Sequence, residues 1–426
     1  MTDILTPRDA KEVEAAVQWA LGAERALEIV GHGSKRAIGR PAQTDLTLDL
    51  ASLSGVTLYE PDELVLSAKA GTSLGEIEAL VASKGQQLAF EPMDYAPLLG
   101  STAGRGTIGG ALAANLAGPR RIKAGAARDH FLGFSAVSGR GETFKSGGRV
   151  VKNVTGYDLC KLMAGSWGTL AALTEVTIKV LPRPETEATV FLAGLDDAKA
   201  VAAMTAAMGT SCEVSGAAHL PATVAARVPL GEAMAAGRAL TALRLEGVAP
   251  SVAHRKAVVM AAMRPFGEVG AVDDMVSRNL WRAVRDVTPF AAIRTGAEVP
   301  LWCISTAPAK GAELMRLIAA AVDADVLYDW AGGRLWVLIW RADDAAAALV
   351  RGAVKACGGH ATLVRAPAAM RAAADVFEPP ETALAVQDPP SALVAWGGLA
   401  GGGSSPLPRQ RSCFSASPSA PRRSPT

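Results

Sequence analysis

The chain has 426 residues, half of them hydrophobic, and carries 43 basic against 41 acidic side chains. This length predicts roughly two or three domains with well-filled cores. The net charge of +2 argues against a nucleic-acid-binding surface. Charges, Gly or Pro interrupt every apolar segment before it reaches a membrane-spanning length, so no transmembrane helix is predicted.

The N-terminus has neither a basic nor an apolar stretch, which argues against a secretory signal and predicts a cytoplasmic protein. The cysteines lie far apart in the sequence, with no Cys-x-x-Cys pair. They are Cys160, Cys212, Cys303, Cys357 and Cys413. This spacing predicts free thiols and supplies no ligand set for zinc or for an iron–sulfur cluster.

The first predicted elements are a helix, a strand and a glycine loop. The segment from Thr6 to Asp9 offers a capping hydroxyl, a helix-starting proline and an acidic residue, and the helix ends near Gly22. A short buried strand over 27–30 leads into a loop over 31–35, Gly-His-Gly-Ser-Lys. Successive N–H groups in such a loop can converge on a pyrophosphate, with the Ser34 hydroxyl as a further donor. An ordinary tight turn is the alternative.

Short strands and helices mix in the next part of the chain. Strands are predicted over 45–50, 64–70 and near 87–90, and a helix over 74–84. This mixture is typical of an α/β or α+β domain.

A glycine-rich segment over 99–115 then runs into an Ala/Leu-rich helix. A loop without Cβ atoms lets its backbone approach a flat or phosphorylated ligand closely. The free N–H groups at the start of the helix would attract an anion.

Three arginines follow this loop, Arg120, Arg121 and Arg128. They either pair with phosphate or carboxylate groups of a ligand or are solvated on the surface, and exposed charges favour the second alternative. Residues 134–137 and 142–144 predict a hairpin with a glycine-rich turn.

A change of composition at Glu185 predicts a domain boundary, with a first domain over 1–184 and a smaller α+β domain over 185–378. In the predicted strand over 334–340, Trp336 alternates with Val337, so one row of side chains is expected to meet helices and the other an interface. Residues 379–426 are rich in Pro, Ser, Gly and Arg without apolar periodicity, and predict a disordered tail.

Three segments together resemble a known family: residues 29–35, residues 106–115, and residues 155–159 with 165–170. In this order they resemble the FAD-binding half of the flavin-linked oxidases of the vanillyl-alcohol-oxidase type. Within that family they are most similar to FAD-binding subunits of bacterial glycolate oxidases. The resemblance implies an α+β fold, in which a two-subdomain FAD-binding domain of this type precedes the smaller α+β domain.

The resemblance also implies which residues bind FAD. Gly31, Gly33 and Ser34 would hold the pyrophosphate. The ribityl chain and the isoalloxazine ring would be lined by Ser101, Gly106, Thr107, Ile108, Gly109, Gly110, Gly168, Thr169 and Leu170. Ser34 occupies the position where some members of the wider family tether FAD through a histidine, which implies non-covalent FAD.

Two departures from the family's pattern affect the expected chemistry. Related catalytic subunits carry a His-x-Gly-Asp-Gly-x-x-His pattern, whereas the second domain here has only His219, His254 and His360, none of them paired. No catalytic residue and no metal ligand is therefore assigned. The family's usual Phe-Asp-Pro…Asn-Pro-Gly-Arg ending is replaced after Phe377 by the Pro- and Ser-rich tail.

The resemblance implies an FAD-binding subunit of a glycolate oxidase complex, in which electrons pass from glycolate, a small 2-hydroxy acid, through flavin to an iron–sulfur subunit. A catalytic flavoprotein subunit would be the other partner. These partners would hold the chain in the cytoplasm or peripherally at the inner membrane. Two alternatives remain: a stand-alone FAD-dependent oxidoreductase for another hydroxy acid, and a structural subunit with weakened flavin binding.

Overall fold

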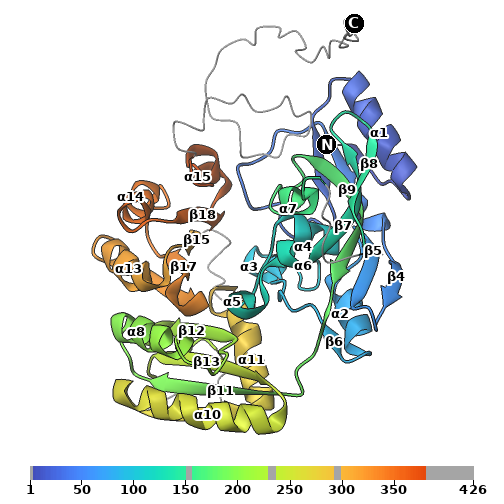
Figure 1. Ribbon diagram of the computed structural model, residues 1–426. Helices are drawn as coiled ribbons and strands as arrows, with labels where there is room; N and C mark the ends of the chain where they lie inside the picture. Colours follow the sequence, from blue (N-terminus) through green and yellow to red (C-terminus); the bar gives the residue numbers. More distant parts are fainter. Residues whose placement is uncertain (1–2, 150–155, 229–236, 292–298, 380–426) are drawn as a thin grey trace, which may run out of the picture.

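Two groups of strands organise the chain, one in its N-terminal part and one in its C-terminal part (Figure 1). The computed structural model describes residues 3–149, 156–228, 237–291 and 299–379. The tail predicted over 379–426 thus lies outside the described residues, apart from Pro379.

The N-terminal part contains a small parallel sheet and a larger antiparallel one. The parallel sheet has the order β1 (Asp3–Leu5), β3 (Leu46–Asp49), β2 (Leu27–Val30). The five-stranded antiparallel sheet has the order β4 (Val56–Glu60), β5 (Val65–Lys69), β9 (Ala171–Lys179), β7 (Phe131–Ser138), β8 (Thr143–Gly147). A further pair joins β6 (Gln86–Gln87) to β10 (Leu181–Pro182). The helices are α1 (Ala10–Gly22), α2 (Leu74–Ala82), α3 (Tyr95–Leu98), α4 (Ile108–Ala113), α5 (Arg121–Ala124), α6 (Ala127–His130) and α7 (Leu159–Met163).

The C-terminal part is built on one eight-stranded sheet. Its order is β14 (Val269–Asp273), β11 (Thr186–Ala193), β13 (Leu240–Gly247), β12 (Gly216–Leu220), β16 (Ala324–Asp329), β17 (Arg334–Ile339), β15 (Leu301–Ser305), β18 (His360–Arg365). The helices are α8 (Asp197–Met208), α9 (Ala222–Ala225), α10 (Ala249–Met263), α11 (Asp274–Arg285), α12 (Thr288–Ala291), α13 (Gly311–Ala319), α14 (Ala347–Cys357) and α15 (Ala368–Ala373). The mixture of helices and sheets in both parts confirms the predicted α+β class.

The first helix and one strand differ from their predicted form. Asp9, not Thr6, caps α1, because its carboxylate accepts the Glu12 N–H at 2.9 Å while the Glu12 carboxylate accepts the Arg8 N–H at 2.8 Å. These two hydrogen bonds place the start of the helix after Pro7. The strand predicted near 87–90 is only the two-residue β6, and Leu88 and Phe90 are core side chains that follow it.

Strand β17 confirms the prediction of two rows of side chains. Val337 packs in the core that α8, α10, α13 and α14 cover, whereas Trp336 packs in the core that the sheet shares with the N-terminal part. There the Trp336 ring meets the Tyr95 ring edge to face, with ring centroids 6.2 Å apart. The sheet therefore has one face toward its own helices and one face toward the N-terminal part.

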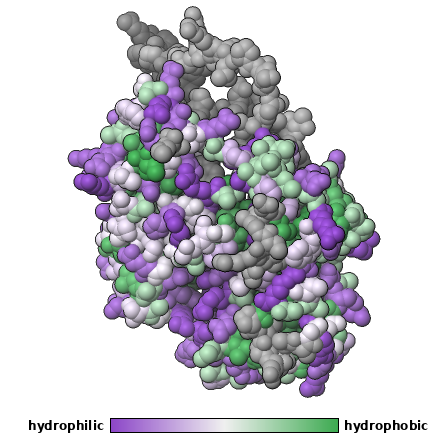
Figure 2. All heavy atoms as spheres, turned by 180° about the vertical axis from the view of Figure 1, so that it is seen from behind, coloured by the Kyte–Doolittle hydropathy of each residue, from purple (hydrophilic) through white to green (hydrophobic). Residues whose placement is uncertain are grey.

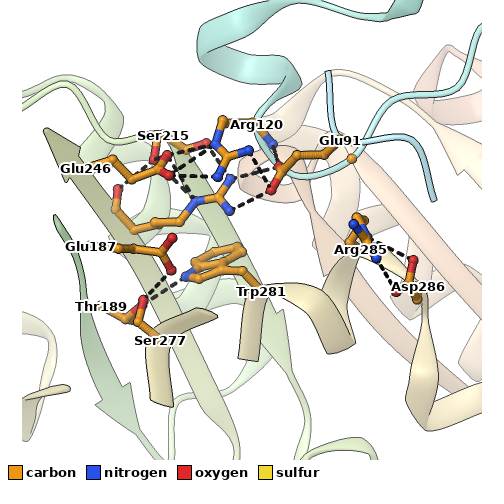
Figure 3. Close-up of polar contacts among 12 residues, drawn as sticks. Glu91, Arg120, Glu187, Thr189, Ser215, Glu246, Ser277, Trp281, Arg285 and Asp286 are labelled. Atoms are coloured by element: carbon orange, nitrogen blue, oxygen red, sulfur yellow. Dashed lines mark hydrogen bonds and ion pairs between the residues drawn. The ribbon is translucent and has the colours of Figure 1, made fainter. Parts of the chain in front are cut away.

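A buried network of ion pairs also joins the two parts (Figure 3). Arg244 on β13 is 2.9 Å from the Glu91 carboxylate, and Arg120 is 2.7 Å from the Glu246 carboxylate. Arg120 also lies 3.0 Å from the Glu91 carboxylate, and Arg244 lies 3.5 Å from the Glu246 carboxylate. Each of the two carboxylates therefore forms an ion pair with both guanidinium groups. Such paired, hydrogen-bonded charges are tolerated in a core, whereas a single member left alone would be costly.

The described helices include none that is long and apolar enough to cross a membrane. On the face of the molecule in Figure 2, hydrophilic and hydrophobic residues are interspersed. Cys160, Cys212, Cys303 and Cys357 are free thiols, as predicted, and Cys413 lies outside the described residues.

Candidate functional site

One cavity in the N-terminal part brings together segments that lie far apart in the sequence. It is lined by the loop over 31–35 after β2, by the start and the face of α4, and by Trp167 and Gly168. The open space between these atoms, including the mouth of the cavity, is about 720 Å³.

The two glycine loops touch each other at this cavity. A Cβ atom on Gly31 would lie 2.7 Å from the Thr107 hydroxyl oxygen, so only glycine fits there. The Arg105 guanidinium adds a second link, because it donates to the His32 carbonyl at 2.7 and 3.0 Å. These contacts pack two of the glycine-rich segments against each other, and both segments line the cavity.

The backbone N–H groups of the two loops have different roles. At the start of α4, those of Ile108, Gly109 and Gly110 donate to Thr72 O, Ala70 O and Thr107 Oγ1 at 2.9, 2.9 and 3.2 Å. The expectation that the start of this helix offers free donors to an anion is therefore wrong. In the loop over 31–35, by contrast, the N–H groups of Gly33 and Ser34 have no acceptor among the described residues.

Lys35 supplies a cation at the meeting point of the two loops. Its ammonium nitrogen lies 3.3 Å from the Ser34 hydroxyl oxygen and would lie 3.2 Å from a Cβ on Gly110. Burial lowers the pKa of Lys35 to about 8, although the charge of Asp94 opposes this shift. Among the described residues, no carboxylate lies within ion-pair distance of it. A half-buried cation without a carboxylate partner favours binding of an anion beside it.

Part of the cavity wall is apolar. Ala113 and Ala114 of α4 lie there with Ala171 and Leu173 of β9. A loop with free N–H donors and a lysine, together with apolar side chains, would suit a cofactor with a diphosphate and a flat ring system.

The structure gathers some of the predicted cofactor residues and separates others. The cavity lining includes Gly31, Gly33, Ser34, Thr107, Gly109, Gly110 and Gly168. Five predicted residues lie outside the lining: Ser101, Gly106, Ile108, Thr169 and Leu170.

The separation has local causes. Gly106 packs against Leu74, and Ile108 is buried in the core. The Thr169 hydroxyl donates to Ser166 O at 2.7 Å within its own turn. Ser101 is exposed, and Leu170 is 36% exposed. Lys35 belongs to the predicted loop over 31–35, but the sequence does not predict a role for it, because its isolation from carboxylates depends on the tertiary structure.

The three arginines that follow the second glycine loop, for which a solvated surface position was the favoured prediction, lie outside this cavity. Arg120 belongs to the buried ion network, so neither the ligand contact nor the solvated surface applies to it. Arg121 is exposed, and its guanidinium group lies 4.2 Å from the centroid of the Trp330 ring. Arg128 is exposed, and its backbone N–H donates to the Asn115 side chain at 3.0 Å.

The histidines of the C-terminal part are spread over the fold. His219 is fully buried in the sheet, where its Nδ1 lies 2.9 Å from Thr241 Oγ1. His254 and His360 are exposed. Within the described residues, no group of three or more His, Cys, Asp or Glu side chains is arranged to hold a metal ion.

Comparison with known proteins supports this interpretation of the cavity. Residues 3–147 match the family described as FAD binding domain. The chain is 46% identical over 168 residues to glycolate oxidase subunit GlcE of Escherichia coli K12, covering 39% of this chain and 46% of the relative. It is 30% identical over 191 residues to glycolate oxidase subunit GlcD of Bacillus subtilis 168, covering 44% and 38%. The chain thus spans less than half the length of either relative in these matches.

A solved structure extends the likeness of fold across most of the chain. Alkyldihydroxyacetonephosphate synthase aligns with a TM-score of 0.64 at 16% identity, over 84% of this chain and 71% of the other. At this identity the match describes the fold alone. It confirms the predicted architecture, in which an FAD-binding domain is followed by a further α+β part.

Proposed function

Because residues 3–147 belong to the FAD binding domain family, we propose that the chain is the FAD-binding subunit of a glycolate oxidase complex and holds FAD non-covalently. One observation carries this proposal: two distant glycine loops and the turn at Gly168 line one cavity, which contains the unpaired cation of Lys35. The likeness to subunits GlcE and GlcD supports the choice of complex.

Different residues of the cavity would contact different parts of FAD. Gly33 and Ser34 would donate backbone N–H groups to the pyrophosphate, and the Lys35 ammonium group would neutralise part of its charge. Gly31 lets this loop approach Thr107, while Thr107, Gly109, Gly110 and Gly168 would lie along the ribityl chain and the ring. When bound, FAD supplies the acceptor for electrons from the substrate.

Some predicted residues would act from behind the cavity. Gly106 and Ile108 hold the second loop against Leu74 and the core, and so would support the lining without forming it. For Ser101, Thr169 and Leu170, a contact with FAD remains a prediction. The same is true of the boundary at residue 184 between the two domains.

The substrate and the partners follow from the proposed complex. The substrate would be glycolate, a small 2-hydroxy acid, and its electrons would pass through flavin to an iron–sulfur subunit. A catalytic flavoprotein subunit would be the second partner. We place the complex in the cytoplasm or peripherally at the inner membrane. No catalytic base is assigned in this chain.

Reconstitution tests the proposed function. The chain is produced with a catalytic flavoprotein subunit and an iron–sulfur subunit of glycolate oxidase, and glycolate-dependent reduction of an artificial acceptor is measured. We expect activity to require this chain. Turnover by the chain alone would instead favour the stand-alone oxidoreductase. Full activity of a complex in which this chain carries no flavin would favour the structural subunit.

A further inference from the structure

A second hollow lies between the N-terminal part and the eight-stranded sheet. It contains about 800 Å³ of open space and shares Ala114, at the end of α4, with the first cavity. Asn115 and Arg121 line it from the N-terminal part, and Trp330, Arg334 and His360 line it from the C-terminal part. Both parts are therefore needed to form it.

Two guanidinium groups are held on one tryptophan ring in this hollow. The Arg121 guanidinium lies 4.2 Å from the centroid of the Trp330 ring, and the Arg334 guanidinium lies 4.6 Å from it. The ring itself is fixed, because its Nε1 donates to Gly118 O at 3.0 Å. Arg334 is further held by a hydrogen bond to Ala117 O at 2.6 Å. The cation–π contacts thus orient both arginines before any ligand arrives.

Among the residues that the structure describes, neither guanidinium forms an ion pair. Arg334 is only 4% exposed, and its Nε is buried without a hydrogen-bond partner. Burial and the like charge of Arg334 both lower the pKa of Arg121. Arg121 is exposed, so the buried charge that lacks a carboxylate partner is that of Arg334.

Acidic groups nearby have other partners. The Asp329 carboxylate, one residue before Trp330, accepts the Trp330 N–H at 2.8 Å, and burial raises its pKa to about 6. Asp129 accepts the Ala126 N–H at 2.9 Å. Neither carboxylate lies within ion-pair distance of the two arginines. The described carboxylates beside the hollow therefore form no salt bridge with Arg121 or Arg334.

We propose that the hollow lined by Arg121 and Arg334 is a binding site for a small carboxylate, of the class to which 2-hydroxy acids belong. Planar guanidinium groups match the two oxygens of a carboxylate. Asn115 adds a donor for a neighbouring hydroxyl, because its side-chain oxygen is occupied by the Arg128 N–H while its amide nitrogen is not. This inference deepens the proposed function by giving this subunit its own substrate-binding site beside the cofactor cavity.

Calorimetric titration tests this site in the full chain, both without FAD and loaded with FAD. The probes are glycolate, acetate and inorganic phosphate. We expect glycolate to bind more tightly than acetate, because it also offers a hydroxyl, and phosphate to bind most weakly. We expect the Arg121→Gln variant to bind glycolate at least tenfold more weakly. Arg128→Gln is the matched control, since both arginines are exposed but only Arg121 lines the hollow, and the affinity of this variant for glycolate is expected to be unchanged.

Several results would overturn the proposal. They are the absence of carboxylate binding by a folded chain, phosphate binding as tight as that of glycolate, and equal losses in the two arginine variants. Displacement of the carboxylate by FAD would also overturn it, because the arginines would then belong to the cofactor site. Arg121-dependent glycolate binding by a chain that does not take up FAD would support this site while contradicting the proposed function. If Arg121→Gln does not fold, as judged from its thermal transition, Arg121→Lys takes its place.

Discussion

Gly31 lies against the side chain of Thr107, so close that a Cβ atom on Gly31 would come within 2.7 Å of the threonine hydroxyl oxygen. Thr107 in turn accepts the Gly110 N–H and thereby caps α4. One contact therefore fixes the distance between the two loops and the start of the helix that lines the cavity. The shape of the proposed FAD site depends on it.

Gly31→Ala is expected to destabilise the protein by about 1–3 kcal/mol, because the added methyl group overpacks this contact. It should also weaken FAD binding by roughly tenfold, since the loops must separate to admit the methyl group. Thermal unfolding and FAD titration measure the two effects. Gly75→Ala is the control: Gly75 is an exposed residue of α2 with no atom near the added Cβ, and the change should stabilise by about 0.5–1 kcal/mol. Equal effects of the two substitutions would contradict the role of the contact.

Lys35→Met is expected to weaken FAD binding by roughly 10- to 100-fold. This loss corresponds to the free energy of a hydrogen bond to a charged group, which is about 1.5–3 kcal/mol. Because burial lowers the pKa of Lys35 to about 8, the wild-type affinity should fall as the pH rises through this value and the ammonium group loses its proton. The affinity of the variant should not change over this range. Lys11→Met, on the exposed face of α1, should bind FAD like the wild type. A wild-type affinity that is constant from pH 7 to about 9 would be inconsistent with this role.

Arg244→Met is expected to lower the free energy of unfolding by about 3–5 kcal/mol, because it leaves Glu91 and Glu246 buried with one cation fewer. Burial alone would raise the pKa of Glu246, but the guanidinium groups of Arg244 and Arg120 lower this pKa to about 2. Arg238→Met removes an exposed pair with Glu268 and should change stability by less than about 1 kcal/mol. Chemical denaturation compares the two variants. A loss as small as that of the control would show that the network does not hold the two parts together.

Asp329→Asn is expected to stabilise the protein at neutral pH by about 1–3 kcal/mol, because it removes a charge that the core disfavours. Burial raises the pKa of Asp329 from 3.8 to about 6 in the folded protein. The folded state therefore binds this proton more tightly, and the resulting stabilisation is present below pH 3.8 and lost as the pH rises through about 6. The difference in the free energy of unfolding between variant and wild type should therefore increase over this pH range. Asp62→Asn, in an exposed turn, should show no such change.

Local patterns in the sequence were sufficient for most of the N-terminal part. The strand over 27–30, the hairpin of β7 and β8, and the glycine loops were predicted correctly because each depends on neighbouring residues. The alternation of Trp336 and Val337 also predicted the two faces of β17.

Long-range contacts determined what the sequence did not predict. Arg120 pairs with Glu246, which lies 126 residues away. The N–H groups at the start of α4 are taken by Thr72 and Ala70, which lie on a separate segment. Arg121 and Arg334 meet on Trp330 only after the two parts have packed together. In each case the partner is chosen by tertiary structure, which no local pattern contains.

Titration of the purified chain with FAD, followed through the absorption and fluorescence of the flavin, tests the central claim most directly. We predict one FAD bound per chain, released intact when the protein is denatured, with weaker binding by Gly31→Ala and Lys35→Met than by Gly75→Ala and Lys11→Met. A folded chain whose added flavin keeps the spectrum of free FAD, or whose affinity is the same in all four variants, would contradict it.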